Sequence, residues 1–176
     1  MMFDKFKVIN VILYVIDKYG EKTDMHKLFK TLYFADQEHL SKYGRTITKD
    51  TYIAMQFGPV PSKIDDILKA VRGDSFFEAG DLTDYFEFIN HYIVKSKKKC
   101  NTDYLSKSDI ECLDNSISIC RDKSFEELTM LSHGYAWNST AKGASMDYAD
   151  ILAEDGDSEE YIDYIKGKMF LEKLFC

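Results

Sequence analysis

The sequence has few prolines and no closely paired cysteines. Only Pro59 and Pro61 occur, and both lie in one short segment. No two cysteines have the Cys-x-x-Cys spacing of a zinc or redox motif. Two of them lie eight residues apart in a predicted helix, a separation of about two turns that is too long for a disulfide. We therefore expect free thiols at Cys100, Cys112, Cys120 and Cys176.

Long apolar runs are absent as well. No segment reaches the roughly 18 uncharged apolar residues of a transmembrane helix. Near the N-terminus, Asp4, Lys5 and Lys7 interrupt the apolar residues, so the continuous apolar region of a secretion signal is missing. These absences predict a cytoplasmic protein that does not span a membrane.

The sequence also lacks a basic surface. Its net charge is -7, and the only basic run is Lys95-Ser-Lys-Lys-Lys99. Because nucleic-acid binding needs clustered cations that neutralise phosphates, we do not expect nucleic acid to be the main partner. Residues 147–163 hold eight acidic residues and no Lys or Arg. The first interpretation of this run is a solvated loop and helix start, where acidic side chains meet the helix dipole favourably. The functional alternative is a patch that speeds the encounter with a basic protein.

Motifs of enzymes and metal sites are missing too. Asp36 and His39 share a helix face, but no second pair of ligands has helical or hairpin spacing. There is no G-x-S-x-G elbow, and Lys142-Gly-Ala-Ser145 is too short for a phosphate-binding loop. We therefore expect no catalytic residues, no metal and no cofactor. One alternative stays open: an enzyme that binds a small molecule or nucleotide at a site assembled from Asp36, His39, Tyr52 and His133.

Aromatic and apolar residues, in contrast, are plentiful. With 12 Phe, 12 Tyr and 45% hydrophobic residues, the 176-residue chain can bury a sizeable core. Its length and the lack of repeats or linkers predict a single domain over residues 1–176. Helical periodicity and capping residues predict about six helices. They begin near residue 3, after Thr23 or Asp24, and after Ser62, Ser106, Ser124 and Ser158.

The expected architecture is α+β and predominantly helical, with a small antiparallel sheet. Residues 46–57 have strand propensity. Clustered aromatic residues between positions 76 and 105 predict two or three short strands, with turns at Gly80-Asp81 and Asn90-His91.

Three of the predicted helices begin with the Ser-x-x-Asp/Glu pattern of a capping box. The pairs are Ser62 with Asp65, Ser106 with Asp109, and Ser124 with Glu127. Apolar spacing predicts that the helix after Ser124 buries Phe125, Leu128 and Leu131.

The segment around the two prolines predicts a rigid corner. Gly58-Pro59 permits a tight reversal, and Pro61 holds Val60 extended just before a helix. Apolar side chains on such a corner would lose little conformational entropy on binding. The candidates for contact with a partner are Tyr52, Phe57, Pro59 and Val60. A structural turn that positions the following helix is the alternative.

Three blocks of the sequence resemble the Panacea antitoxin domain, a family also described as SocA-like and phage-associated. They are Met25-His-Lys-Leu-Phe-Lys-Thr-Leu-Tyr-Phe-Ala-Asp36, Tyr52-Ile-Ala-Met-Gln-Phe-Gly-Pro-Val60 and Ser132-His-Gly-Tyr-Ala-Trp137. The residues that carry the pattern are Leu28, Leu32, Tyr33, Ala54, Gly58, His133 and Trp137. The resemblance covers most of the chain and is weaker over the acidic C-terminal helical segment, residues 145–176.

This resemblance implies an antitoxin of a toxin-antitoxin system, which neutralises a cognate toxin by direct protein–protein binding and needs no cofactor. We expect the corner to anchor the toxin and acidic side chains to steer a basic one. The acidic candidates are Asp150, Asp155, Glu159 and Glu160. A proteolytic adaptor that delivers the toxin to a protease is the alternative within the same family. Neither the toxin nor the oligomeric state follows from the sequence.

Overall fold

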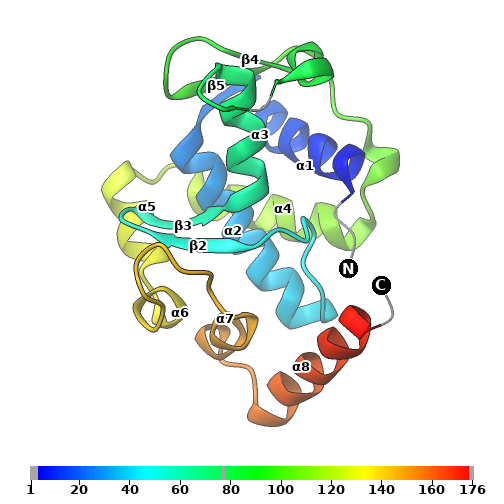
Figure 1. The fold of residues 1–176 in the computed structure, drawn as a ribbon, viewed down its shortest axis with the longest axis vertical. Helices are drawn as coiled ribbons and strands as arrows, with labels where there is room; N and C mark the ends of the chain where they lie inside the picture. Colours follow the sequence, from blue (N-terminus) through cyan, green and yellow to red (C-terminus); the bar gives the residue numbers. More distant parts are fainter. Residues whose placement is uncertain (1–3, 77, 175–176) are drawn as a thin grey trace.

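Helix α2 (Met25–Tyr43) crosses the middle of the molecule and contacts elements from the N-terminal, central and C-terminal parts of the chain (Figure 1). The structure is a computed structural model that describes residues 4–76 and 78–174. The other helices of these residues are α1 (Lys5–Lys18), α3 (Ser62–Arg72), α4 (Lys107–Cys120), α5 (Phe125–Ser132), α6 (Tyr135–Asn138), α7 (Tyr148–Asp155) and α8 (Glu159–Leu174). The strands are β1 (Lys22–Asp24), β2 (Tyr52–Met55), β3 (Gly58–Pro61), β4 (Phe86–Phe88) and β5 (Ile93–Ser96).

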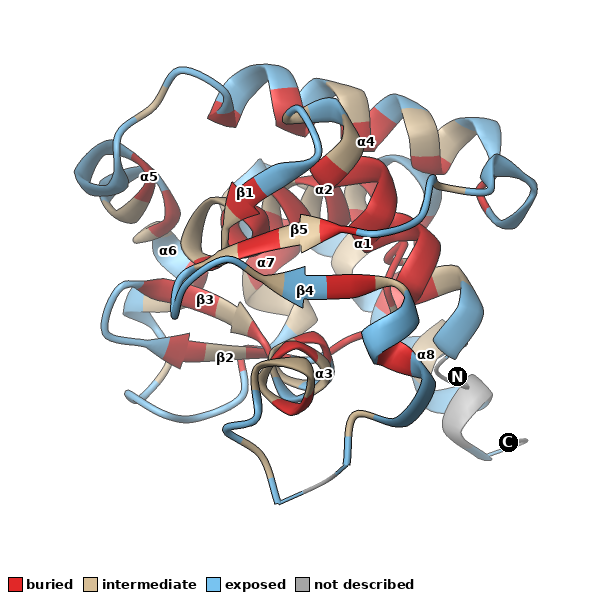
Figure 2. Cartoon of the chain, turned by 90° about the horizontal axis from the view of Figure 1, so that it is seen from above, coloured by how far each residue is buried: buried red, intermediate tan, exposed pale blue. Residues whose placement is uncertain are grey.

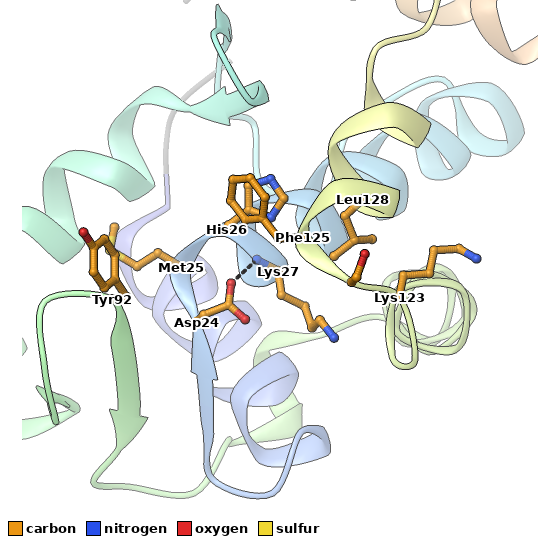
Figure 3. A pocket seen from close by; sticks show the side chains of 9 residues that line it. Asp24, Met25, His26, Lys27, Tyr92, Lys123, Phe125 and Leu128 are labelled. Carbon is orange, nitrogen blue, oxygen red and sulfur yellow. Dashed lines mark hydrogen bonds between the residues drawn. The ribbon is translucent and has the colours of Figure 1, made fainter.

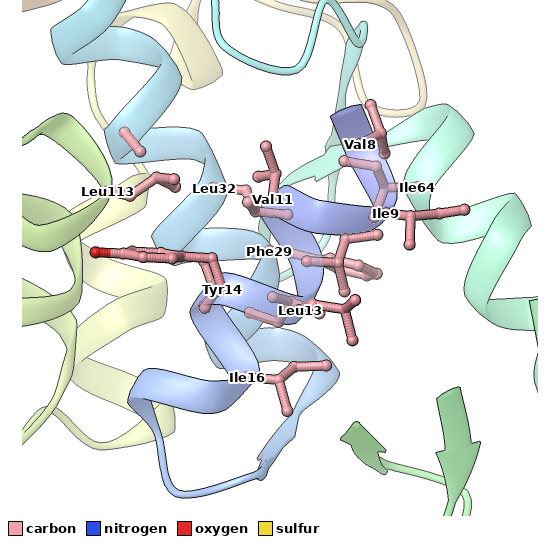
Figure 4. Close-up of a cluster of buried hydrophobic side chains, with 14 of the residues drawn as sticks. Val8, Ile9, Val11, Leu13, Tyr14, Ile16, Phe29, Leu32, Ile64 and Leu113 are labelled. Atoms are coloured by element: carbon pink, nitrogen blue, oxygen red, sulfur yellow. The ribbon is translucent and has the colours of Figure 1, made fainter. Parts of the chain in front are cut away.

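Helix α1 forms the centre of the larger core. Every side chain from Val8 to Ile16 is buried. Figure 4 labels several of their apolar side chains, from Val8 to Ile16, among Phe29 and Leu32 of α2, Ile64 of α3 and Leu113 of α4. Since each fully buried Leu, Ile, Val or Phe contributes about 1.5–3 kcal/mol, this cluster is a main source of stability.

A second, smaller core lies between α2 and the C-terminal helices. Tyr33 of α2, Tyr52 of β2, Ile151 of α7 and Ile165 of α8 belong to it. Figure 2 shows long buried stretches on α1 and α2, whereas α5 carries mostly exposed and half-buried residues. Because α2 contributes to both cores, it joins the N-terminal and C-terminal parts of the fold.

The strands form two separate antiparallel sheets. One sheet has the order β1-β5-β4. The predicted turn at Asn90-His91 connects β4 to β5 and is confirmed. The edge strand β1 was not predicted. Gly80–Asp84 is a 3-10 helix, so the prediction of a strand turn there was wrong. The second sheet is the β2–β3 hairpin, in which Met55 lies opposite Gly58. The predicted α+β class, mainly helical with a small antiparallel sheet, is confirmed.

Several predicted helix starts are confirmed. The carboxylate of Asp24 accepts a hydrogen bond from the backbone N–H of Lys27 at 2.8 Å and caps α2. Ser106 and Ser124 each form the reciprocal hydrogen bonds of a capping box. The two short helices α6 and α7 were not predicted.

The start of α3 differs from the prediction. Ser62 makes no side-chain cap, and the capping position is taken by Pro61. Instead, the carboxylate of Asp50 accepts hydrogen bonds from the backbone N–H groups of Lys63 and Ile64, at 3.0 and 2.9 Å. The capping-box prediction at Ser62 was therefore wrong, because the helix starts at Ser62 itself and a carboxylate from the loop after α2 accepts the hydrogen bonds of its first turn.

Two findings concern the whole of residues 4–76 and 78–174. None of their helices is long and apolar enough to cross a membrane. Cys100, Cys112 and Cys120 are free thiols, as predicted, and Cys176 lies outside the described residues.

Candidate partner-binding surface

The β2–β3 hairpin points its turn towards α5 and α6. Figures 1 and 2 both show the turn beside these two helices, at one end of the molecule. Gln56 and Phe57 make the reversal between Met55 and Gly58. Gly58 has a φ of 98°, in the left-handed region, and a Cβ there would overlap Ser132 Oγ. Glycine is therefore needed at this position for both conformation and space.

Three rings meet beside this turn, and we call them the aromatic cluster: His26, Phe57 and Phe125. The ring centroid of Phe125 lies 5.2 Å from that of Phe57 and 4.0 Å from that of His26. Phe57 is 49% exposed and Phe125 is 44% exposed. The prediction that Phe125 is buried was wrong, because its face of α5 meets the hairpin turn and leaves the ring half open to solvent.

Further apolar side chains are exposed on the same elements. Met55 precedes the turn, Met130 and Leu131 lie on α5, and Tyr135 begins α6. Leu131 was also predicted to be buried, and this prediction was wrong. Exposed apolar side chains that gather on neighbouring elements are typical of an interaction surface.

A cavity of about 390 Å³ adjoins the aromatic cluster (Figure 3). It lies where α2 and α5 begin, next to the turn between β4 and β5. Its lining is apolar and charged, with two lysines and one carboxylate: it includes Asp24, Met25, Lys27, Tyr92, Lys123, Phe125 and Leu128. Phe125 and His26 belong to both the cavity and the aromatic cluster, so the two form one continuous surface.

Two of the predicted partner contacts are interior residues. Tyr52 is 2% exposed, and Pro59 is buried as well. The hydroxyl of Tyr52 donates a hydrogen bond to Asp36 at 2.8 Å. Neither side chain is accessible to a partner in this conformation, so the structure does not favour Tyr52 and Pro59 as contacts, and their role in binding stays a prediction. Val60 is half-buried against the larger core, which leaves Phe57 as the most accessible candidate of the corner.

Lys30 lies directly beneath the hairpin turn. It is 1% exposed, and its ammonium group donates a hydrogen bond to the backbone carbonyl of Pro59 at 2.9 Å. Burial lowers the pKa of Lys30 from 10.5 to about 7. The burial of Lys30 could not be predicted from the sequence, because lysine is almost never fully buried without a partner.

His133 and Trp137 connect α5 and α6 to the hairpin. Their rings stack with centroids 3.6 Å apart and planes 9° apart. The indole N–H of Trp137 donates a hydrogen bond to the backbone carbonyl of Met55 at 2.9 Å. Burial, and secondarily the nearby Lys30, lowers the pKa of His133. The stacked pair therefore holds α6 against the strand that leads into the turn.

Glu154 of α7 has a structural role that the sequence did not reveal. Its carboxylate accepts hydrogen bonds from the hydroxyl of Tyr33, the amide of Gln37 and the backbone N–H of Ala136, at 3.2, 3.1 and 2.7 Å. A Cβ at Gly134 would overlap this carboxylate. Its position in the acidic run was the only sequence signal, and that run does not distinguish Glu154 from its solvated neighbours.

The four residues of the suggested dispersed enzyme site do not come together. Asp36 accepts the hydrogen bond from Tyr52. Burial raises the pKa of the Asp36 carboxyl, although the hydrogen bonds that it accepts lower it. His39 instead lies 3.2 Å from Asp109, and His133 stacks on the indole described above. Within residues 4–76 and 78–174, no group of three or more His, Cys, Asp or Glu side chains is arranged to hold a metal.

The acidic candidates lie apart from the aromatic cluster. Asp155, Glu159 and Glu160 are exposed around the turn between α7 and α8, and Asp150 is half-buried on α7. In Figure 1, α6 and α7 lie between this turn and the hairpin turn. The structure therefore does not bring the acidic and aromatic candidates into one site.

The four lysines of the basic run contact their own chain. Lys95 forms an ion pair with Glu87 at 3.3 Å, and Lys99 forms one with Glu21 at 2.6 Å. The ammonium group of Lys97 donates a hydrogen bond to the backbone carbonyl of Thr83. The ammonium group of Lys98 lies over the ring of Tyr85. Their charges are thus partly matched within the molecule.

Comparison with known protein families identifies the chain. The sequence model of a family described as "Antitoxin SocA-like, Panacea domain" matches residues 28–138. This region runs from α2 to α6, and it contains Phe57, Phe125 and the buried Lys30. Four of the expected motif residues, Leu28, Leu32, Tyr33 and Ala54, are buried and support the fold. The match ends before α7 and therefore before the acidic segment.

Neither a search of curated proteins nor a search of solved structures found a match. The family match extends over more than half of the chain. The protein therefore belongs to the SocA-like antitoxin family and contains its Panacea domain.

Proposed function

We propose that this protein is an antitoxin that neutralises a cognate toxin by binding it directly. Its membership of a family described as antitoxin-like carries the proposal. The half-exposed aromatic cluster supports direct binding, because aromatic side chains are enriched at interfaces and among the residues that dominate binding energy.

The aromatic cluster is the proposed anchor for the toxin. The backbone around Phe57 is held by several contacts, including a 3.3 Å contact between His26 Nε2 and the carbonyl of Phe57. The indole of Trp137 holds the carbonyl of Met55 on the other side of the turn. A held turn loses little entropy when a partner binds. An apolar side chain of the toxin would pack on Phe57 and Phe125 and extend into the adjoining cavity.

The acidic turn between α7 and α8 is the proposed steering element. Asp155, Glu159 and Glu160 are exposed and have no basic residue between positions 147 and 163 to balance them. A field of one sign raises the rate of encounter with an oppositely charged protein. Because the acidic turn lies apart from the anchor, we expect it to change the association rate more than the dissociation rate.

Co-expression of the protein with the toxic product of an adjacent open reading frame tests this function. Restored growth, together with co-purification of a stable pair, is the expected result. Restored growth without a stable pair, and with a shortened toxin half-life, would favour the proteolytic adaptor. A toxin that remains active and does not associate with the protein would contradict the antitoxin function.

A further inference from the structure

Lys30 is a buried amine without a carboxylate partner among the described residues. Its ammonium nitrogen donates to a single backbone carbonyl, that of Pro59, and no ion pair joins Lys30 to an Asp or Glu in residues 4–76 and 78–174. An ammonium group taken out of water without a carboxylate partner is strongly disfavoured. An apolar side chain of similar length would fill the same space without this cost.

The groups around Lys30 do not supply the missing anion. His26 lies one helical turn earlier on α2, and His133 directly follows α5. Burial and, secondarily, the charge of Lys30 lower the pKa of both. His26 Nδ1 and His133 Nε2 are buried and have no hydrogen-bond partner among the described residues. Cys120 of α4 is the other titratable group that acts on Lys30, and burial raises the pKa of its thiol. The region thus contains polar atoms whose bonding capacity is unused.

The cover over Lys30 is thin and is part of the proposed anchor. A Cβ at Gly58 would come within 2.9 Å of the ammonium nitrogen, so the hairpin turn lies directly on it. Met55, Gln56 and Phe57, at the tip of the hairpin, are all exposed to solvent. A small displacement of the turn, next to the half-exposed Phe57, would open Lys30 to the surface.

We propose that Lys30 is a binding residue that pairs, in the complex, with a carboxylate of the toxin. This carboxylate would lie beside an apolar side chain that packs on Phe57 and Phe125, and it would reach the ammonium group as the hairpin turn shifts. The inference rests on the proposed function and narrows it to an acidic and apolar segment of the toxin. It also explains why a costly charge lies under an exposed surface.

The variant Lys30→Met separates a binding role from a structural one. In the free protein, we expect the urea midpoint at pH 6 to stay equal or rise, because a buried charge is removed. The affinity for the toxin should fall by about 30-fold or more, as for a central interface residue. Lys42→Met is the matched control, because Lys42 lies near the other end of the same helix, outside the lining of the cavity, and pairs with Glu38 at 2.6 Å. It should bind within about threefold of the wild type, as expected for a residue outside the centre of the interface.

A measurement on the unchanged protein gives a second test. In the free protein, Lys30 loses its proton above pH 7. The neighbouring groups do not titrate with it, because the pKa values of His26 and His133 are lowered and that of Cys120 is raised. Pairing with a carboxylate must then take up a proton, so the dissociation constant should rise by up to about tenfold per pH unit between pH 7.5 and 9. The slope should vanish in Lys30→Met.

The outcomes distinguish this inference from the proposed function. A wild-type protein that neither rescues growth nor binds the toxin would contradict the proposed function, and the stability of free Lys30→Met would still decide the role of Lys30. A large loss of stability in that variant would make Lys30 a structural residue and overturn the inference. Equal toxin affinity for wild type and Lys30→Met, with growth rescued by both, would overturn the inference and leave the antitoxin function intact.

Discussion

The carboxylate of Asp50 accepts a hydrogen bond from the backbone N–H of Ile64 at 2.9 Å, so a loop residue caps the first turn of α3. Asp50 is fully buried, and it also binds the N–H groups of Thr51 and Lys63. Burial raises the pKa of Asp50, although these hydrogen bonds act against the shift. One side chain thereby joins the loop after α2, strand β2 and helix α3.

Replacement of this cap should be far more destabilising than replacement of Ser62. We expect Asp50→Ala to lower the free energy of unfolding by at least about 2 kcal/mol, because three backbone N–H groups lose their acceptor. Ser62→Ala, at the position where the sequence predicted the cap, should cost less than about 0.5 kcal/mol. Urea titrations of both variants measure the difference. Equal losses would mean that Ser62 shares the capping role.

The protonation of Lys30 should appear in the pH dependence of stability. Its pKa is about 7 in the folded protein and about 10.4 in the unfolded chain, so between these values the unfolded state binds more protons. Stability should therefore rise with pH across this window, by up to about 1.4 kcal/mol per unit. The difference between wild type and Lys30→Met, measured by urea unfolding from pH 6 to 9.5, isolates this contribution. A constant difference would show that Lys30 does not titrate there.

The anchor residues should matter for binding more than for folding. We expect Phe57→Ala and Phe125→Ala each to weaken toxin binding by at least about tenfold and to cost under about 1.5 kcal/mol of stability, since both rings are already half exposed. Phe6→Ala is a matched control, because Phe6 is also half exposed and contacts one aromatic ring, that of Tyr104. Titration calorimetry with the purified toxin measures the affinities. Equal affinity for all three variants would exclude the aromatic cluster as the anchor.

The acidic turn should act on the rate of association. Reversal of Asp155, Glu159 and Glu160 to Lys should lower the association rate at least about tenfold at low salt and flatten its salt dependence. Stopped-flow measurements at several salt concentrations test this. Reversal of Glu78, Asp84 and Asp103, which are also exposed, changes the net charge equally at other positions and is the control. Identical effects of both sets would indicate general charge rather than a steering element.

The helix starts show which features of the fold could be read from the sequence. At Ser106 and Ser124 the donor and acceptor of each capping bond lie within four residues, so the local pattern is sufficient. At Ser62 the same pattern failed, because Asp50 reaches the N–H groups from a distance in sequence that no local pattern records. Helices α6 and α7 were missed for a related reason: Glu154 and the stacked Trp137 hold them through tertiary contacts.

The candidate site shows the same division. The sequence by itself determined the α+β class, the helix starts with local caps and the turn at Gly58, because each depends on residues that are close in the chain. Only the tertiary structure decided that Tyr52 is buried while Phe57 and Phe125 are half exposed. It also decided that Lys30 lies beneath the turn, with no carboxylate partner in the part of the chain that the structure describes. Burial and pKa depend on the elements that pack around a side chain, and these elements come from distant parts of the sequence.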